Sequence, residues 1–154
     1  APVSSSRIRR HLGSGEVRDA ADLLGRPYAL TGRVCRGDGR GRTIGFPTAN
    51  LSAIPAGRVI PANGVYAVTV TGERLSGQVN GMMNIGIRPT FEGDGRHVEA
   101  HLFDVDIDLY ESELRVEFVR WIRAERKFGS VDELIAQLKR DEARCRAALS
   151  RTGE

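Results

Sequence analysis

The run GVYAVTVTG, from Gly64 to Gly72, decides the fold class of this chain. Valine, threonine and tyrosine dominate it, and such β-branched and aromatic residues favour extended backbone, in which successive side chains point to opposite faces. The turn-forming group Pro-Ala-Asn-Gly, residues 61–64, leads directly into it. The run is therefore predicted to be a β-strand that follows a tight turn.

Further runs with a period of about two residues lie on both sides of the first. Clusters of glycine, proline, asparagine and aspartate separate them, and no helical pattern intervenes. Five or six strands at hairpin spacing predict an antiparallel sheet that closes into a small barrel, and they exclude a parallel α/β fold. The other runs are YALTGRVCRG (28–37), LSGQVNGMMNIGI (75–87), HVEAHLFDVDIDL (97–109) and LRVEFVRWIR (114–123).

Helical patterns flank this β segment. In residues 1–27, apolar residues recur at helical spacing in two short pieces, which Gly13 and Gly15 separate and Pro27 ends. We interpret residues 1–27 as a connector. At the other end, Ser130 followed by Glu133 is the pattern of a capping box. The apolar stripe that follows is expected to pack against the barrel: Val131, Leu134, Ile135, Leu138, Cys145 and Leu149.

Composition bounds the function. The 154 residues are 40% hydrophobic and 28% charged, which is typical of one folded unit. Basic and acidic residues are interspersed, so a net charge of +3 is weak evidence for nucleic acid and fits a small anionic ligand equally well. Cys35 and Cys145 have no metal-like spacing, and no apolar run reaches the roughly 20 residues that span a bilayer. We expect a cytoplasmic protein with neither nucleic acid nor a membrane as partner.

The stretch RGDGRGRTIGFPTAN, residues 36–50, carries the candidate chemistry. Its glycines let the backbone approach a ligand and direct N–H groups at phosphate oxygens. It does not match a Walker A loop, because Arg42 stands where the second glycine is required when counted from Gly37. It also lacks the third glycine of the dinucleotide fingerprint. Glycine content alone favours a hairpin loop with solvated arginines.

Pro47 stiffens the step that follows these glycines. It fixes its own φ and biases Phe46 toward extended backbone, so Thr48 and Asn50, two residues apart, face the same side. A hydroxyl and an amide carbonyl are hard, neutral ligands suited to a Mg²⁺ ion that also binds water and nucleotide phosphates. The alternative is a turn in which both side chains satisfy local backbone, and the PTAN step alone does not exclude it.

At these residues the sequence resembles riboflavin kinase. GRVCRGDGRGRTIGFPTANL is similar to the signature of that family, and the resemblance covers about residues 28–149. The opening VSSSRIRRHLGSG is similar to the segment that ends the adenylyltransferase half of bacterial bifunctional FAD synthetases. Glu111 departs from the family pattern, which has glycine after the preceding tyrosine. Three further segments follow in the family's order: NIGIRPTF (84–91), HVEAHLFD (97–104) and LRVEFVRWIRAERKF (114–128).

The resemblance implies a mainly β fold, a six-stranded antiparallel Greek-key barrel with a C-terminal helix, over residues 28–154. Residues 1–27 would then lead from an N-terminal FMN adenylyltransferase domain. It implies riboflavin and ATP as substrates, FMN and ADP as products, and Mg²⁺ as the metal, with Zn²⁺ or Mn²⁺ as alternatives. Thr48 and Asn50 would bind the metal. The implied nucleotide-binding residues are Gly37, Gly39, Arg40, Gly41, Arg42, Thr48, Asn50 and Asn84.

Glu99, in HVEAHLF, matches the catalytic glutamate of the family. Phosphorylating an alcohol requires in-line placement, charge neutralisation and an acceptor for the hydroxyl proton, and one carboxylate suffices as that acceptor. Such a base typically contributes about 10²–10⁴-fold to the rate. The resemblance also indicates Arg123, Glu125 and Phe128 as flavin contacts, because an aromatic ring beside an arginine can stack on a planar heterocycle. Arg123 and Phe128 are equally compatible with a structural role.

Other readings of these residues stay open. His97, Glu99 and His101 share a strand face and form a His-x-Glu-x-His pattern, which we rank below the base because neighbours on one flat strand rarely enclose an ion. The aspartates of DVDID mimic the start of an EF-hand loop without its glycine and glutamate, and we expect them on a solvated strand face. Functions of other classes are a flavin-binding module without catalysis and a single-stranded nucleic-acid binder, for which 6% aromatic residues is a low content.

Overall fold

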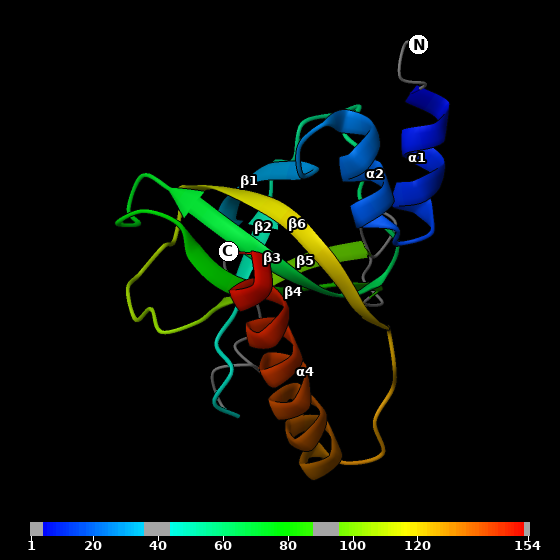
Figure 1. Cartoon of the computed structure of the whole chain (residues 1–154). Helices are drawn as coiled ribbons and strands as arrows, with labels where there is room; N and C mark the ends of the chain where they lie inside the picture. The colour runs from blue at the N-terminus through cyan, green and yellow to red at the C-terminus, as the bar shows by residue number, and fades with distance from the viewer. Residues whose placement is uncertain (1–4, 36–43, 88–95, 153–154) are drawn as a thin grey trace.

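Six strands form a closed antiparallel barrel in the order β1-β2-β5-β4-β3-β6, with the helices outside it (Figure 1). The computed structural model describes residues 5–35, 44–87 and 96–152. The described strands are β1 (Ala29–Cys35), β2 (Ala49–Ser52), β3 (Gly64–Gly72), β4 (Val79–Ile87), β5 (Arg96–Leu102) and β6 (Glu113–Ala124). The described helices are α1 (Ser5–Gly13), α2 (Val17–Leu24) and α4 (Val131–Thr152).

The strand order is that of a Greek key. β3, β4 and β5 pair as consecutive antiparallel neighbours, and β6 returns over a longer connection to pair with β3 on its other side. β6 also pairs with β1, and this pairing closes the barrel. The predicted mainly β, six-stranded barrel with a C-terminal helix is confirmed.

β3 is buried on both faces, which explains why its sequence is apolar almost throughout. Tyr66 and Val68 point into the barrel, where the ring of Phe118 meets Tyr66 edge-on with 5.1 Å between the ring centroids. Val65 and Ala67 point outward into a second cluster of buried side chains. This strand therefore joins the interior of the barrel to the layer beneath α4.

α4 covers one outer face of the barrel and begins at the predicted capping box. The backbone N–H of Glu133 donates to Ser130 Oγ at 3.2 Å, and Glu133 Oε2 accepts from the N–H of Gly129 at 3.0 Å. Cys145 is fully buried in the second cluster, whereas Val131 is 59% exposed. The predicted stripe is thus confirmed at Ile135, Leu138, Cys145 and Leu149. It is wrong at Val131, which lies in the exposed first turn of α4.

The two predicted N-terminal helical pieces are α1 and α2. The sharp corner between them needs Gly15, whose φ is +77° and whose missing side chain makes room for the Trp121 ring on β6. The carbonyl of Leu12 accepts from the backbone N–H of Ala62 at 2.9 Å. The corner is therefore fixed to the barrel by packing and by a backbone hydrogen bond. No helix among the described residues has the length and apolar character that a membrane span needs.

The segment after β5 corrects one prediction. The strand predicted over residues 97–109 ends at Leu102, and residues 105–109 have no regular structure. Asp104 has a φ of +60°, which turns the chain out of the ladder, and Arg146 of α4 holds its carboxylate at 3.0 Å. Asp106 and Asp108 are exposed, as expected, but the strand face predicted for these aspartates is wrong.

Candidate functional site

Three polar side chains lie side by side on the outer wall of the barrel. Asn50 of β2 is the register partner of Glu99 on β5, and Glu99 is the register partner of Asn84 on β4. Partners in an antiparallel pair share a face and have Cα atoms about 4.5–5.5 Å apart. Val98 and Ala100, the neighbours of Glu99, are buried inside the barrel, so Glu99 points outward. We call Asn50, Glu99 and Asn84 the polar row.

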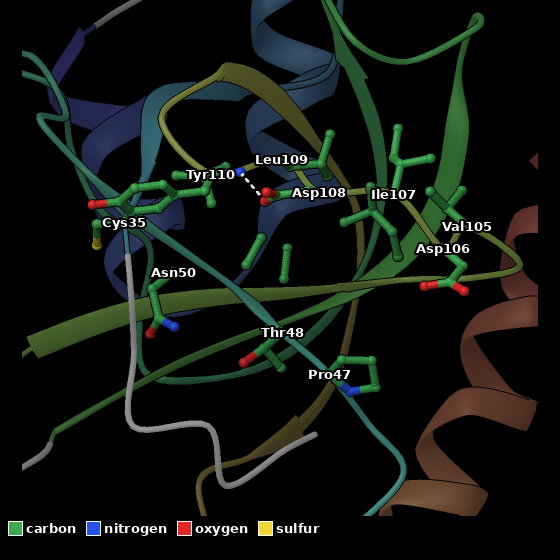
Figure 2. Close-up of a pocket in the computed structure, with 14 residues that line it drawn as sticks. Cys35, Pro47, Thr48, Asn50, Val105, Asp106, Ile107, Asp108, Leu109 and Tyr110 are labelled. Atoms are coloured by element: carbon green, nitrogen blue, oxygen red, sulfur yellow. Dashed lines mark hydrogen bonds between the residues drawn. The ribbon is translucent and has the colours of Figure 1, made fainter. Parts of the chain in front are cut away.

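Thr48 extends the polar row toward the start of β2. It precedes β2, is exposed, and lies on the same side of the chain as Asn50 in Figure 2. Both side chains line a hollow of about 660 Å³ whose opposite wall is the irregular segment 105–110. After Pro47, Thr48 and Asn50 therefore lie on one side of the chain, and Glu99 lies on the adjacent strand.

Glu99 is a shielded carboxylate with a histidine beside it. Its side chain is 13% exposed, and Glu99 Oε1 lies 3.4 Å from His97 Nε2. His97 Nδ1 is buried and has no hydrogen-bond partner among the described residues. A carboxylate can only accept, so the proton of a neutral His97 is assigned to Nε2, because a buried lone pair at Nδ1 costs less than a buried unpaired N–H.

His101 faces the other way along β5. Its Nδ1 lies 2.6 Å from the carbonyl oxygen of Pro47, and its Nε2 lies 3.9 Å from Glu142 Oε1. The three members of the His-x-Glu-x-His pattern do share a face, but the two histidines engage different partners. Their contacts are those of positioning groups and not of a common chelate.

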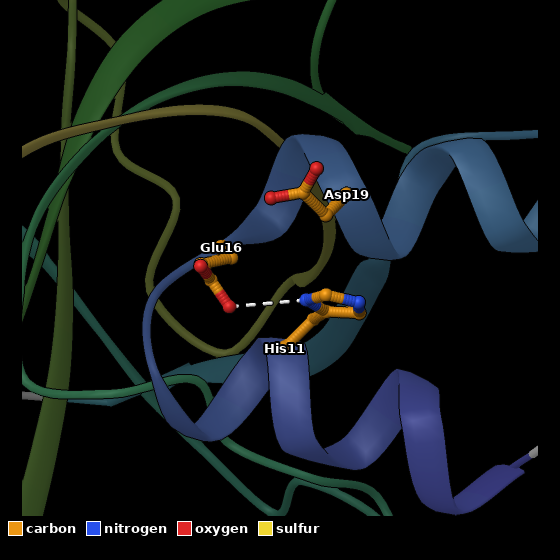
Figure 3. Close-up of side chains that lie close together, drawn as sticks. All are labelled: His11, Glu16 and Asp19. Atoms are coloured by element: carbon orange, nitrogen blue, oxygen red, sulfur yellow. Dashed lines mark hydrogen bonds and ion pairs between the residues drawn. The ribbon is translucent and has the colours of Figure 1, made fainter.

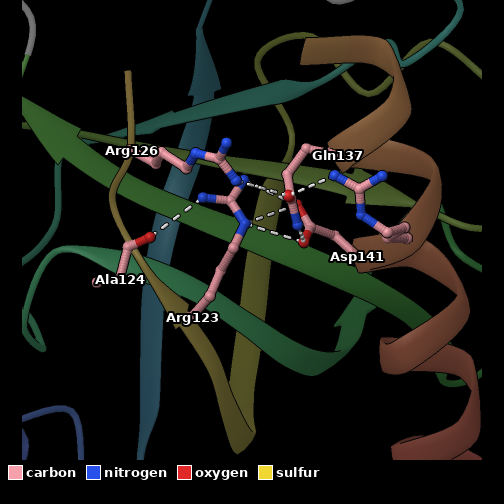
Figure 4. A network of polar contacts seen from close by, with 6 residues as sticks. Arg123, Ala124, Arg126, Gln137 and Asp141 are labelled. Atoms are coloured by element: carbon pink, nitrogen blue, oxygen red, sulfur yellow. Dashed lines mark hydrogen bonds and ion pairs between the residues drawn. The ribbon is translucent and has the colours of Figure 1, made fainter. Parts of the chain in front are cut away.

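The polar row continues across the wall to the predicted flavin residues. Asn84 is the register partner of Val65 on β3, which is in turn the partner of Arg123 on β6. Figure 4 shows the Arg123 guanidinium directed at Asp141 of α4. Arg123 Nε and one terminal nitrogen donate to both carboxylate oxygens at 2.8–3.0 Å, and the guanidinium lies over the Phe128 ring, 5.7 Å from its centroid.

Glu125 closes the same end of the barrel. Its Oε2 accepts a hydrogen bond from the backbone N–H of Ile87 at 3.0 Å, which joins the end of β6 to the end of β4. Gly86 permits this contact, because a Cβ there would lie 2.0 Å from the Glu125 carboxylate. Arg123 and Phe128 thus contact each other at this end of the barrel, where Glu125 lies between them in the chain, and all three have partners within the protein.

Sequence reasoning missed Asp141, which is fully buried and also accepts from Gln137 Nε2 at 2.8 Å. A signal for it was present. Asp141 lies three residues after Leu138 and four before Cys145, so the helical period places it on the apolar stripe of α4. A carboxylate on such a stripe requires a charged partner, and Arg123 is that partner.

Five predicted nucleotide-binding residues lie outside the described part of the chain: Gly37, Gly39, Arg40, Gly41 and Arg42. Elsewhere, one group of side chains within the described residues lies close enough together to hold a metal ion: His11, Glu16 and Asp19 at the α1–α2 corner (Figure 3). His11 Nδ1 lies 3.0 Å from Glu16 Oε1. This group shares no element with the polar row, and its ion pair spans the helix corner.

Known proteins resemble this chain in sequence and in fold. The family model described as Flavokinase, riboflavin kinase, matches residues 24–149. A bifunctional riboflavin kinase/FMN adenylyltransferase from Escherichia coli (strain K12) is 46% identical over 145 residues, which cover 94% of this chain and 45% of that protein. The chain thus spans about half the length of the curated relatives it matches.

Two solved structures share the fold. A Streptococcus pneumoniae structure described as a macrolide-efflux protein has a TM-score of 0.86 at 41% identity, covering 94% of this chain and 46% of that one. Riboflavin kinase from Trypanosoma brucei has a TM-score of 0.58 at 21% identity, covering 80% of this chain and 78% of that one. The second likeness bears on the fold alone.

Proposed function

Because this chain belongs to the riboflavin kinase family, we propose that it transfers the γ-phosphoryl group of ATP to the ribityl 5′-hydroxyl of riboflavin, giving FMN and ADP. The observation that supports this most strongly is the polar row. It sets one carboxylate between two amide side chains, one strand spacing from each, on the wall that also carries Thr48. A phosphoryl transfer needs a proton acceptor beside a nucleotide-binding segment, and Glu99 beside Thr48 and Asn50 fits that requirement.

Glu99 is the proposed base. As the 5′-oxygen forms its bond to the γ-phosphorus, the O–H bond breaks and the proton passes to the Glu99 carboxylate, while the bond from the γ-phosphorus to the bridging oxygen breaks and ADP leaves. His97 Nε2, 3.4 Å from Glu99 Oε1, would help to hold the carboxylate in place. Asn84 lies on the far side of Glu99 from Asn50, where its amide can hydrogen-bond a nucleotide or the ribityl chain.

Thr48 and Asn50 are the proposed protein ligands of the metal. They offer one hydroxyl and one amide oxygen, while the nearby imidazoles of His97 and His101 contact Glu99 and the Pro47 carbonyl. Oxygen donors without an imidazole or thiolate fit Mg²⁺ or Mn²⁺ better than Zn²⁺. When bound, the metal would neutralise charge on the phosphates. Arg40 and Arg42, with Gly37, Gly39 and Gly41, stay our prediction for the remaining phosphate contacts.

We assign the flavin ring to the end of the barrel where β6 leads into α4. Phe128 is a half-buried aromatic ring at this end, and Glu125, whose carboxylate accepts from the Ile87 N–H, lies three residues before it. Arg123 is the third proposed contact. Because Asp141 already orients its guanidinium, Arg123 would meet the flavin at low entropic cost.

The relatives' names pair riboflavin kinase with FMN adenylyltransferase. We propose that, in the full-length protein, residues 1–27 follow an N-terminal FMN adenylyltransferase domain and residues 28–154 form the kinase unit. The α1–α2 corner packs against Trp121 and Ala62, so this segment would hold such a domain in a fixed direction.

The test is product formation. The purified chain is incubated with riboflavin, ATP and Mg²⁺, and FMN and ADP are separated by chromatography. We expect equal amounts of FMN and ADP, and no FMN without ATP. A chain that binds riboflavin but leaves it unphosphorylated would be a flavin-binding module, and the proposal would be wrong.

A further inference from the structure

Just before β2 begins, a side-chain contact from His101 on β5 takes the place of the backbone pairing between the two strands. The pairing of β2 with β5 begins at Ala49, which is opposite Ala100, so Thr48 lies just outside the ladder. Beyond that pair, His101 Nδ1 holds the carbonyl of Pro47 at 2.6 Å. A carbonyl only accepts, so Nδ1 carries the proton and donates. A side chain of β5 thus fastens the segment that the ladder does not reach.

Packing fixes the imidazole itself. Its ring meets Phe46 and Phe103 in edge-on contacts, with centroids 5.4 and 5.7 Å away, and its side chain is 13% exposed. The Nε2 edge faces Glu142 of α4. The ring therefore has little rotational freedom, and its Nδ1 direction is set by two aromatic neighbours.

This hydrogen bond completes the constraint on the peptide that leads into Thr48. The proline ring fixes φ of Pro47, and holding the carbonyl oxygen restricts ψ of the same residue. With both dihedral angles of Pro47 restrained, the position of the Thr48 backbone follows. We propose that His101 is a positioning residue that preorganises Thr48 for the metal–nucleotide complex. The inference rests on the proposed function.

Two substitutions at His101 distinguish the role of Nδ1 from that of Nε2. In His101→Asn, the amide nitrogen takes the place of Nδ1 and can still donate to Pro47. In His101→Gln, the longer side chain places its amide near the former Nε2 instead. We expect His101→Gln to raise the KM for MgATP about three- to tenfold, the equivalent of one hydrogen bond, with a smaller change in kcat. His101→Asn should stay within about twofold of the parent, because its amide keeps the hydrogen bond to the Pro47 carbonyl.

The experiment measures kcat and KM for MgATP and for riboflavin, and titrates Mg·ADP by calorimetry, on the parent chain and both variants. His11→Gln is the matched control, since that histidine lies at the α1–α2 corner. The KM for riboflavin should not move in any of them. If the Asn and Gln variants bind Mg·ADP equally well, or if both lose kcat and riboflavin binding together, the positioning role is wrong.

The same data separate this inference from the proposed function. A parent chain that binds Mg·ADP but makes no FMN would overturn the kinase assignment, while different Mg·ADP affinities of the two variants would still support the role of His101. A parent chain that does not bind Mg·ADP overturns both.

Discussion

Replacing Asp141 by asparagine is expected to loosen α4 from the barrel. Asp141 is fully buried, and it accepts three hydrogen bonds from Arg123 and one from Gln137, all at 2.8–3.0 Å. Asparagine keeps the shape but turns one acceptor into a donor that faces other donors. Breaking a buried ion pair costs about 3–5 kcal/mol, and because Arg123 is 16% exposed we expect the lower value, about 3 kcal/mol.

That loss is large beside a stability of about 5–15 kcal/mol for a native domain. Thermal unfolding followed by circular dichroism should show Tm lower by about 6–12 °C, from roughly 2–4 °C per kcal/mol at this chain length. Asp104→Asn, which removes an exposed contact with Arg146, serves as the control and should leave Tm almost unchanged.

A double variant tests whether the broken ion pair is the reason for the expected loss of stability, as well as how large that loss is. Arg123→Met with Asp141→Leu removes both charges, so it should recover most of the stability that Asp141→Asn loses. If Asp141→Asn instead costs less than about 1 kcal/mol, like an ordinary surface change, the ion pair does not hold α4 in place and the reasoning is wrong.

Three further outcomes follow from single residues. Glu111 has a φ of +68°, so Glu111→Gly should raise the free energy of unfolding by about 0.5–1 kcal/mol in urea titrations; a loss of stability would show that the turn carries no strain. Burial raises the pKa of Cys145 to about 12, so at pH 8.5 iodoacetamide should modify the half-buried Cys35 and spare Cys145, as read by mass spectrometry. Because the Cys145 thiol ionises at a lower pH in the unfolded chain than in the folded one, the free energy of unfolding should fall as pH rises from about 8.5 toward 12. Labelling of both thiols in the folded chain would contradict the burial of Cys145. Thr48→Ala should raise the KM for MgATP and spare that for riboflavin; an unchanged KM for MgATP would remove Thr48 from the metal site.

The barrel was predictable because its strands carry their own signal. The period of two in Arg96–Leu102 and Glu113–Ala124 reports local backbone sterics and the alternation of side chains. The same signal failed in DVDID, residues 104–108, where alternation continues after Asp104 has turned the chain out of the ladder. A pattern of alternating residues does not record where pairing stops. Glu111 was likewise visible from the sequence as a departure from the family pattern, and its φ of +68° lies in the left-handed region that glycine favours.

The sequence predicted which side chains of one segment lie together, but not which segments of the site lie next to each other. The sequence places Thr48 with Asn50, and His97 with Glu99 and His101, because each set lies on one extended segment. That Asn50 lies opposite Glu99 is a matter of register between β2 and β5, which are far apart in the chain. The contact of His101 with the Pro47 carbonyl depends on the same register. Long-range pairing of this kind leaves no trace in local periodicity.

The central claim is that Glu99 accepts the hydroxyl proton beside the nucleotide held by Thr48 and Asn50. The most direct measurement is the kcat of Glu99→Gln, which keeps the size of the side chain and removes the base, alongside calorimetric titration with Mg·ADP. We predict that kcat falls by about 10²–10⁴-fold while Mg·ADP still binds. A Gln variant that forms FMN as fast as the parent chain would contradict the account.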